Sequence, residues 1–211
     1  MVKRPAGLRI GRLALLALLP VLLGGAVPPA STPAEQIGAI EAYLNGLDSL
    51  RASFVQVAPG GGTSTGTLYY ERPDKMRLDY DPPSPIEIVA NGWEVVYHDK
   101  RLKQVSPMLT SSTPLAFLLD DDIRLSGDVT VTGLEQAGDR LRVALVQTDE
   151  PGQGGVELVF DREPLALRSW AITDAQGQTT RIMLKDVETG VPMEDRLFHF
   201  RNPYRFPEWR D

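Results

Sequence analysis

One arginine, Arg72, is well placed for specific polar chemistry. It stands directly before Pro73, at the entrance to a predicted strand that carries Met76, Leu78 and Tyr80 on one face. A guanidinium group there can donate forked hydrogen bonds to carbonyl oxygens left unpaired at a helix C-terminus or in a loop. Such a charge-assisted bond contributes about 1–3 kcal/mol, which is enough to latch a movable segment. The competing interpretation is a turn arginine that faces solvent.

Metal chemistry finds little support in the residue types. The chain has no cysteine and two histidines, His98 and His199, and neither has a second histidine three or four positions away. A zinc site would need both of them plus distant carboxylates, so we interpret them as surface or edge-strand residues and expect no metal. The run Asp120–Asp122 offers oxygen ligands for calcium or magnesium, but a solvated helix end is the favoured interpretation.

Motifs of common enzyme classes are absent from the sequence. It contains no G-x-S-x-G elbow, no phosphate-cradling glycine loop before a helix and no H-E-x-x-H motif. Thiol catalysis is excluded as well, because there is no cysteine. We therefore expect a protein that is not an enzyme and that uses no cofactor.

The apolar side chains indicate a different kind of function, the enclosure of an apolar ligand. Apolar and polar residues alternate through most of the segment 72–119, which indicates strands with one buried face. Each of these apolar residues could instead belong to an ordinary core. The residues predicted to line an apolar cavity are Met76, Leu78, Tyr80, Ile86, Ile88, Trp93 and Val95.

A short and very apolar helix is predicted at the end of this segment. It has almost no polar face, so it has to be buried. It either fills the concave side of the sheet permanently or covers it reversibly as a lid. The residues of this predicted lid helix are Pro114, Leu115, Phe117, Leu118 and Leu119.

The elements around these residues predict a mainly β protein with some α-helix. Thr32 and Glu35 form a capping box, and apolar residues at steps of three and four then predict a helix of about 17 residues. From Ala52 onward the period changes to two, and about eleven strands follow. So few helices cannot cover both faces of so many strands. We therefore expect a strongly curved antiparallel sheet, an open half-barrel, covered by a few helices that enclose an apolar cavity.

The N-terminus carries the pattern of an export signal over residues 1–26. Four cations precede or flank an apolar stretch, Leu13–Leu23, that is too short to span a membrane, and small residues follow it up to Ala26. Cleavage after Ala34 and a retained anchoring helix are the alternatives. Residues 27–211 are then a single domain by length.

Charge and cysteine content restrict the location and the partners. Removal of the four cations changes the formal net charge from −6 to −10, which disfavours nucleic acid and anionic membrane surfaces as partners. Without a cysteine, the end of the signal cannot be lipidated. We expect a soluble exported protein, located in the periplasm if the host is a bacterium.

Several motifs in their order along the chain resemble the LolA family of periplasmic outer-membrane lipoprotein carriers. The resemblance extends over essentially the whole mature chain. It rests on the export signal, the capped helix and the segments Ser53–Gln56, Arg72-Pro73, Leu78–Pro83, Val89–Gly92 and Thr113–Leu119.

This resemblance implies an open half-barrel with a helical lid over an apolar cavity. It implies that Arg72 latches the lid, that Met76 and Leu78 line the cavity and that residues 114–119 form the lid. Relatives often carry large aromatics where this chain has Met76 and Leu78, which leaves the cavity volume and the cargo preference open.

The resemblance also implies partners. Acyl chains of lipoproteins are taken from an inner-membrane ABC transporter (LolCDE-like) and passed to an outer-membrane receptor (LolB-like) by a monomeric carrier. That receptor is itself a lipoprotein, so the missing cysteine favours the carrier. The alternatives are a carrier or sensor of other lipids such as glycolipids, and a non-enzymatic envelope-stress domain that recognises misfolded envelope proteins.

Overall fold

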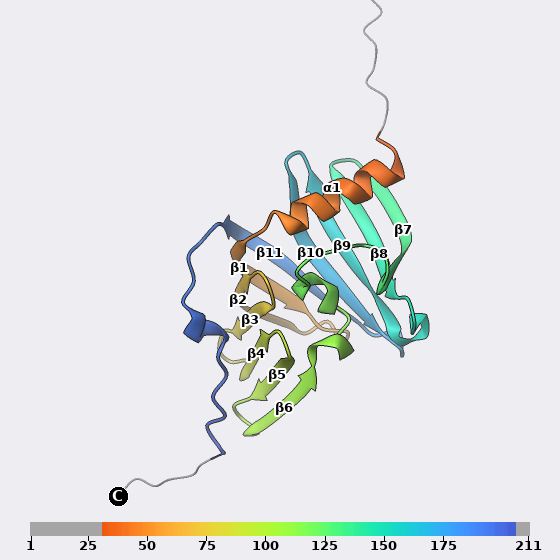
Figure 1. Cartoon of the computed structure of the whole chain (residues 1–211). Coiled ribbons are helices and arrows are strands. Elements are labelled where there is room, and N and C mark those ends of the chain that lie inside the picture. The colour runs from red at the N-terminus through yellow and green to blue at the C-terminus, as the bar shows by residue number, and fades with distance from the viewer. Residues whose placement is uncertain (1–30, 206–211) are drawn as a thin grey trace, which may run out of the picture. The chain divides into compact units, whose positions relative to one another are not determined.

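Eleven strands form one antiparallel sheet in the computed structural model, which describes residues 31–205 (Figure 1). The export signal expected over residues 1–26 lies outside the described residues. One α-helix precedes the sheet, and four short 3₁₀ helices interrupt or follow it. The elements are α1 (Pro33–Asn45), β1 (Ser49–Val57), β2 (Thr63–Glu71), β3 (Lys75–Tyr80), β4 (Ile86–Asn91), β5 (Glu94–Asp99), β6 (Gln104–Leu109), η1 (Thr110–Ser112), η2 (Ala116–Leu119), β7 (Val129–Ala137), β8 (Arg140–Gln147), η3 (Pro151–Gln153), β9 (Gly154–Arg162), β10 (Leu165–Asp174), β11 (Thr179–Thr189) and η4 (Asp195–Phe198).

The sheet is open, with β6 and β7 at its two edges. Its order is β6-β5-β4-β3-β2-β1-β11-β10-β9-β8-β7, so every neighbour is also a neighbour in sequence except the pair β1–β11. Register shifts in β1, β7 and β10 mark irregularities of the kind that bend a sheet. Figure 1 shows β3–β6 turned toward β7–β10, with α1 and the η1–η2 segment against the sheet. The predicted open half-barrel of eleven strands is confirmed.

Helix α1 begins as predicted and ends earlier. Glu35 accepts a hydrogen bond from the Thr32 backbone N–H at 2.7 Å and donates its own N–H to the Thr32 hydroxyl at 3.3 Å. The helix stops at Asn45, with Gly46 as its C-cap, and has 13 residues rather than about 17. Leu50, which lies within the predicted length of about 17 residues, is a buried position of β1.

Two strand boundaries also differ from the prediction. Strand β1 begins at Ser49 rather than Ala52. The sequence also predicts a strand over residues 101–105, directly after a turn at Asp99-Lys100, but β6 begins at Gln104. The second difference has a local cause, because the Asp99 carboxylate accepts hydrogen bonds from the backbone N–H groups of Arg101 and Leu102, each at 2.9 Å. These bonds hold the residues after Asp99 in a turn.

His98 contradicts its interpretation as a surface or edge-strand residue. It lies on β5, an inner strand, and is 4 % exposed. Its Nδ1 is 3.2 Å from a Glu87 carboxylate oxygen, and its Nε2 is 3.1 Å from the Tyr204 hydroxyl. The chain after β11 covers this face of the sheet, which the strand pattern alone does not reveal. His199 is exposed, as predicted.

The face of the sheet that bears His98 is charged and is opposite the apolar one. Arg77 donates to Glu87 at 2.6 Å and to the backbone carbonyl of Leu197 at 2.9 Å. Because side chains alternate along β3, Met76 and Leu78 point to the other face. The sheet therefore keeps its ion pairs on one side and its apolar lining on the other.

Gly66 is a position where the fold tolerates no side chain. A Cβ atom there would lie 2.1 Å from the Asp79 carbonyl oxygen and 2.7 Å from the Phe54 ring. Gly66→Ala should therefore lower the free energy of unfolding by about 1–3 kcal/mol, as overpacking does. The measurement is the midpoint of urea unfolding.

Gly60→Ala is the matched control, because nothing lies within 4 Å of a Cβ at that turn position. It should change stability by less than about 0.5 kcal/mol. Equal unfolding midpoints for the two variants would contradict the close approach at Gly66.

Candidate functional site

An apolar cavity of about 290 Å³ lies between the sheet and the η1–η2 segment. Its walls come from both halves of the sheet, and the segment after β6 closes it. Five of the seven predicted wall residues are among those that line it. The lining residues are Gln56, Met76, Leu78, Tyr80, Ile88, Ala90, Val95, Thr113, Pro114, Leu115, Leu119, Trp170, Ile172, Thr180 and Ile182.

Ile86 and Trp93 are not among the residues that line this cavity. Ile86 is at the start of β4 and is only half-buried. Trp93 falls in the turn between β4 and β5, where Gly92 has a φ of 83°, and its side chain is 86 % exposed. The alternation of buried and exposed side chains stops at a turn. A period of two therefore predicts a buried Trp93, whereas the side chain is exposed.

The wall that β10 and β11 supply was missed at the sequence level. Trp170, Ile172 and Ile182 line the cavity, and they follow the same period of two as the predicted wall. The pattern marks them as buried, but it does not show that these last strands face β3–β5. That placement follows from the pairing of β1 with β11.

The two polar side chains that meet in the wall, Tyr80 and Gln56, are uncharged. The Tyr80 hydroxyl donates to the Gln56 side-chain oxygen at 2.6 Å, and the Tyr80 ring packs edge-on against Phe54 with 5.0 Å between centroids. Burial, with a smaller contribution from Tyr97, raises the pKa of Tyr80 to about 12. The phenol therefore stays neutral at physiological pH, which suits an apolar ligand.

The segment that closes the cavity, together with the two residues that follow it, residues 110–121, is called the lid from here on. It consists of two 3₁₀ turns, η1 and η2, rather than the one predicted helix over residues 114–119. So short a segment makes i→i+3 bonds, such as the one from the Leu118 N–H to the Leu115 carbonyl at 3.0 Å. Pro114, Leu115 and Leu119 contact the cavity, and Phe117 and Leu118 are buried.

Donors from one corner of the sheet satisfy the carbonyl groups at the end of the lid. The Tyr70 hydroxyl donates to the Leu118 carbonyl at 2.6 Å, and the Asp74 backbone N–H donates to the Leu119 carbonyl at 3.2 Å. The corner runs from the end of β2 to the start of β3. Its third donor is Arg72.

Arg72 bridges the lid and helix α1. Its Nη2 donates to the Asp121 carbonyl at 2.6 Å, and its Nη1 donates to the Leu44 carbonyl at 3.1 Å and to the Asn45 side-chain oxygen at 2.8 Å. These are carbonyls of a helix C-terminus and of a loop, the partners that its position suggested. Arg72 is half-buried, so it is not a solvent-facing turn residue.

Asn45 and Glu41 complete the attachment of the chain beyond the lid to α1. The Asn45 side chain donates to the Ile123 carbonyl at 2.8 Å and accepts from the Ile123 N–H at 2.9 Å. The Glu41 carboxylate accepts from the Leu125 N–H at 2.7 Å. No sequence signal marks these two residues, because both are ordinary polar positions of a helix.

Tyr70 is also a residue that the sequence did not single out. Aromatic residues are ordinary in strands, so a buried tyrosine in β2 looks like core. Its environment is more specific, since burial raises its pKa to about 12, opposed by the charge of Arg72 and aided by that of Asp120. The hydroxyl is therefore a permanent donor to the Leu118 carbonyl.

The acidic run Asp120–Asp122 at the end of the lid destabilises the folded state electrostatically. Burial, followed by the charges of Asp128, Asp74 and Asp121, raises the pKa of Asp120. Among the described residues, no group of three or more His, Asp or Glu side chains is arranged to hold a metal ion. Asp121 and Asp122 are exposed, in line with a solvated end of the lid.

Asp120→Asn should stabilise the folded protein at neutral pH. A raised carboxyl pKa means that the folded state prefers the protonated form, so stability falls as pH rises from the unfolded pKa through the folded one. We expect the variant to melt on the order of 1 °C higher than the parent at pH 7, since an exposed charge contributes little. The difference should vanish below about pH 4.

Asp122→Asn serves as the control, because Asp122 forms an ion pair with Arg124 at 2.8 Å. Removal of the Asp122 charge breaks this ion pair and should not raise the melting temperature. Differential scanning calorimetry at several pH values measures both variants. A lower melting temperature for Asp120→Asn at pH 7 would refute the repulsion.

The fold and the site together define a lidded half-barrel that can enclose an apolar ligand. A family model described as "Outer membrane lipoprotein carrier protein LolA" matches residues 45–201. The chain belongs to the LolA family, and the resemblance drawn from its motifs is confirmed. Within residues 31–205, no helix has the length and apolarity to cross a bilayer.

Individual relatives agree with this family. Proteins named outer-membrane lipoprotein carrier protein from Methylococcus capsulatus and Leptothrix cholodnii are 29% and 32% identical to the chain. The alignments cover 89% and 81% of this chain and 93% and 83% of those proteins. A solved DUF1329 family protein from Desulfovibrio piger has a TM-score of 0.50 at 12% identity, covering 78% of this chain and 95% of its own, a likeness of fold alone.

Proposed function

We propose that this protein is a periplasmic carrier that holds the acyl chains of lipoproteins and delivers them to an outer-membrane receptor. The observation that carries the proposal is the apolar cavity closed by a lid whose carbonyls bind Tyr70, Arg72 and Asp74. The names of the relatives from Methylococcus capsulatus and Leptothrix cholodnii support this cargo. The proposal includes export by residues 1–26 and a monomer without catalytic activity.

The size of the cavity implies that the lid has to open. A volume of about 290 Å³ holds roughly twenty to thirty water-sized groups at about 10–15 Å³ each. Three acyl chains of about fifteen methylenes each exceed it, if each methylene occupies about the space of one water. We infer that the described state is closed and that cargo enters when residues 110–121 move away from the sheet.

The energy of acyl-chain transfer limits how tightly such a carrier binds. Three chains of about fifteen methylenes would gain roughly 36 kcal/mol on full burial, at about 0.8 kcal/mol per methylene. Noncovalent affinities do not exceed about 18–21 kcal/mol. The carrier therefore cannot bind three acyl chains as tightly as a bilayer does. Loading then requires work by a partner, for which we propose an inner-membrane ABC transporter.

The hydrogen bonds of the closed lid favour release of the cargo. Opening breaks the bonds from Tyr70 and Arg72 to the Leu118 and Asp121 carbonyls. The loaded state lacks this hydrogen-bond energy, and closing regains it. Closure therefore favours transfer of the cargo to the receptor.

Arg72→Leu should accept cargo and deliver it poorly. The variant loses the bonds that join the lid to α1, so the closed state no longer drives release. We expect the fraction of bound lipoprotein passed to purified receptor to fall at least tenfold. The assay measures transfer from the carrier to receptor in solution, after loading from inner-membrane vesicles with the transporter.

Arg124→Leu is the matched control for this experiment. Arg124 is an exposed arginine of the segment after the lid, and its described bonds go to Asp122. Delivery by this variant should equal that of the parent. Normal delivery by Arg72→Leu would exclude the latch.

Tyr70→Phe should weaken the closed lid without changing the cavity wall. It leaves the buried Leu118 carbonyl without its side-chain donor, a loss of about 1–3 kcal/mol. We expect the cargo-free protein to unfold at lower urea concentration and delivery to slow. The variant should also exchange the amide hydrogens of residues 116–119 faster.

Tyr69→Phe is the control for Tyr70→Phe. Tyr69 is the neighbouring residue on β2 and points to the other face of the sheet. Amide exchange in the lid that is unchanged in Tyr70→Phe, or equally faster in both variants, would contradict the role of the Tyr70 hydroxyl.

The cargo itself is identified by native mass spectrometry of the protein purified from its own periplasm. Triacylated lipoprotein bound to the carrier is the expected result. A free lipid such as a glycolipid would instead indicate a general lipid carrier or sensor. An empty cavity with bound peptides would indicate an envelope-stress interaction domain.

A further inference from the structure

The apolar cavity has one polar end. Among the residues that line it, Gln56, Tyr80 and Thr180 bring polar side chains from the sheet. Gln56 is the last residue but one of β1, Tyr80 is the last of β3, and Thr180 is the second of β11. Because adjacent strands run antiparallel, all three residues lie at the same end of the half-barrel.

This polar end is far from the corner of the sheet that holds the lid. Tyr70, whose hydroxyl binds the Leu118 carbonyl, pairs with Leu50 on β1, and Gln56 lies six residues further along that strand. Six residues of a strand span about 20 Å. The lid attachment and the polar residues therefore lie at opposite ends of the apolar face.

A glycine makes room for the contact between the two polar side chains. Gly66 lies on β2, opposite Phe54 on β1 and Tyr80 on β3. A Cβ atom at Gly66 would lie 2.7 Å from the Phe54 ring, so a side chain there would displace the ring against which Tyr80 packs. The Tyr80 hydroxyl thereby reaches across β2 to Gln56 on β1.

The bond from Tyr80 fixes the orientation of the Gln56 amide. The hydroxyl donates to the Gln56 Oε1 at 2.6 Å, and burial keeps it protonated by raising the pKa of Tyr80 to about 12. The amide Nε2 keeps its two N–H donors. Within residues 31–205, Nε2 has no hydrogen bond, and it is not one of the buried atoms without a partner. Gln56 therefore offers accessible donors to a ligand in the cavity that it lines.

The carbonyl group of an acyl linkage complements this arrangement. An acyl chain is apolar along its methylenes and ends in an ester or amide whose carbonyl oxygen accepts hydrogen bonds. Burial of that oxygen without a donor is unfavourable. With the carbonyl at Gln56, the methylenes extend along Leu78 and Met76, which follow Tyr80 on the same face of β3.

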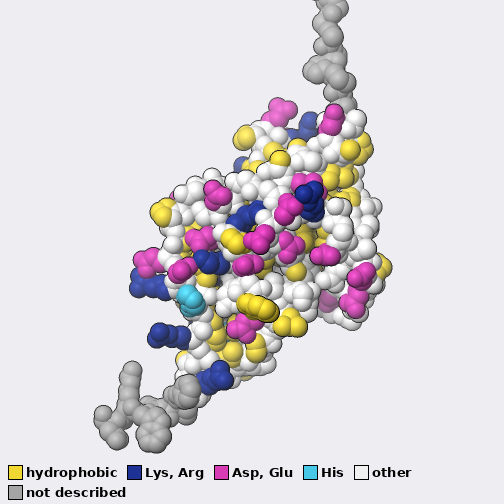
Figure 2. Space-filling view, viewed as in Figure 1, with side chains coloured by type: hydrophobic (Ala, Val, Ile, Leu, Met, Phe, Trp, Pro, Cys, Tyr) yellow, Lys and Arg dark blue, Asp and Glu magenta, His cyan; other side chains and the backbone are white. Residues whose placement is uncertain are grey.

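The charges around the cavity favour a neutral linkage over the carboxylate of a free fatty acid. None of the described residues that line the cavity is charged. Figure 2 shows Asp and Glu side chains gathered over the middle of the viewed face. An anion in the cavity would therefore have no cation in the described wall to offset its burial.

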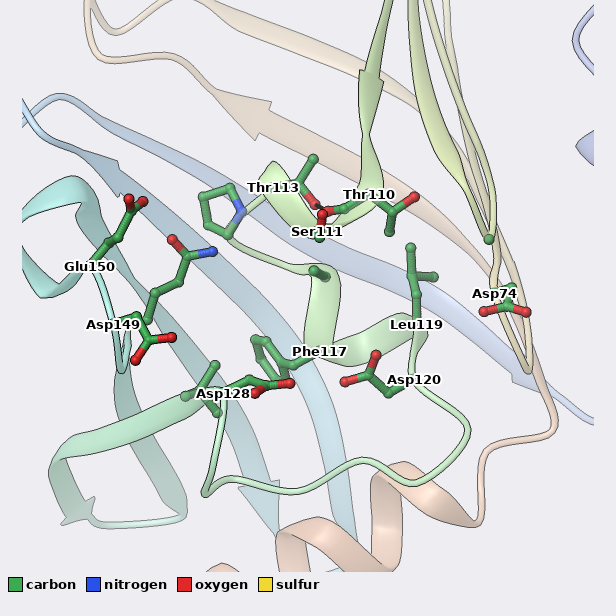
Figure 3. A pocket seen from close by; sticks show the side chains of 15 residues that line it. Asp74, Thr110, Ser111, Thr113, Phe117, Leu119, Asp120, Asp128, Asp149 and Glu150 are labelled. Atoms are coloured by element: carbon green, nitrogen blue, oxygen red, sulfur yellow. Dashed lines mark hydrogen bonds between the residues drawn. The ribbon is translucent and has the colours of Figure 1, made fainter.

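The outer side of the lid adds to this negative potential. A hollow of about 510 Å³ lies there, and carboxylates from separate segments line it (Figure 3). None of them is within 4 Å of a lysine, arginine or histidine nitrogen in the part of the chain that is described. An anionic head group is disfavoured next to so many like charges. These residues are Asp74, Asp120, Asp128, Asp149 and Glu150.

We propose that Gln56, held in place by Tyr80, is a subsite for the neutral carbonyl of an acyl ester or amide. The subsite orients the cargo, with its polar head at the ends of β1 and β3 and its methylenes toward the corner that holds the lid. This inference rests on the proposed function, because the acyl chain is the ligand in both. Tyr80 is a positioning residue, since it acts through Gln56.

The first experiment compares two neutral ligands of equal chain length, methyl myristate and hexadecane. Gln56→Leu should lower the affinity of the mature chain for methyl myristate about two- to tenfold, the effect of one hydrogen bond. It should not lower the affinity for hexadecane, which has no carbonyl. Displacement of the fluorescent probe diphenylhexatriene measures both affinities. An equal loss for the two ligands would show a structural role for Gln56 and overturn the subsite.

Gln176→Leu is the matched control for this comparison. Gln176 is an exposed residue of the turn between β10 and β11 and does not line the cavity. The same substitution there should change neither affinity. A selective loss of methyl myristate binding in Gln176→Leu would contradict the assignment to Gln56.

The second experiment observes the hydrogen bond in the parent protein, so it does not depend on the folding of a variant. Methyl myristate with an isotope label at its carbonyl carbon is bound, and its infrared absorption is recorded. The carbonyl band should lie at lower wavenumber than in hexane, because a hydrogen bond weakens the C=O bond. Tyr80→Phe should shift the band toward its position in hexane, since the amide is no longer held. A parent band at the hexane position would refute the subsite.

The third experiment identifies the chemical source of the carbonyl. Myristate should bind at least tenfold more weakly than methyl myristate at neutral pH, and equal binding would overturn the preference for a neutral linkage. Gln56→Leu should weaken the binding of a triacylated lipopeptide. The same loss with phosphatidylethanolamine assigns the ester, which both ligands carry, whereas a loss confined to the lipopeptide assigns its amide.

The failure of this inference is distinct from the failure of the proposed function. If the parent binds neither hexadecane nor methyl myristate nor lipoprotein, the carrier function fails. If the parent binds them and Gln56→Leu does not discriminate between methyl myristate and hexadecane, the carbonyl subsite alone is refuted.

Discussion

The pairing of the lid carbonyls with one corner of the sheet is the interaction on which the rest of the structure depends. A lid of two 3₁₀ turns cannot satisfy its own last carbonyls, and they are close to an apolar cavity where water is a poor substitute. Tyr70, Arg72 and the Asp74 backbone supply the donors. Because these donors come from a rigid strand end, the apolar residues of the lid are held over the cavity.

The distribution of charge follows from the same arrangement. The cavity wall is neutral, because burial keeps Tyr80 in its phenol form, and the Tyr80 hydroxyl donates a hydrogen bond to Gln56. Ion pairs such as Arg77 with Glu87 lie on the opposite face of the sheet, and unpaired carboxylates surround the other side of the lid. The cavity is therefore lined by uncharged residues, whereas the outer side of the lid faces carboxylates.

Much of the fold was predictable from local patterns, and the exceptions have specific physical causes. Alternation with a period of two identified the strands and five of the seven wall residues, because it reports burial directly. It failed at Trp93, which lies in a turn. The interpretation of His98 was wrong because a segment more than ninety residues later in the chain covers it. Tyr70 was not singled out, because its hydroxyl partner is a backbone carbonyl of the lid.

The sequence by itself determined the curved sheet, the apolar lid, the family and the candidate role of Arg72, since each depends on residue type and spacing. The tertiary structure alone decided what those residues face. It placed β10 and β11 opposite β3–β5 through the β1–β11 pair, attached the lid to Asn45 and Glu41 of α1, and gathered five carboxylates from distant segments into one hollow. Contacts between residues far apart in the chain leave no periodic signal, because any register of the strands would preserve the same alternation.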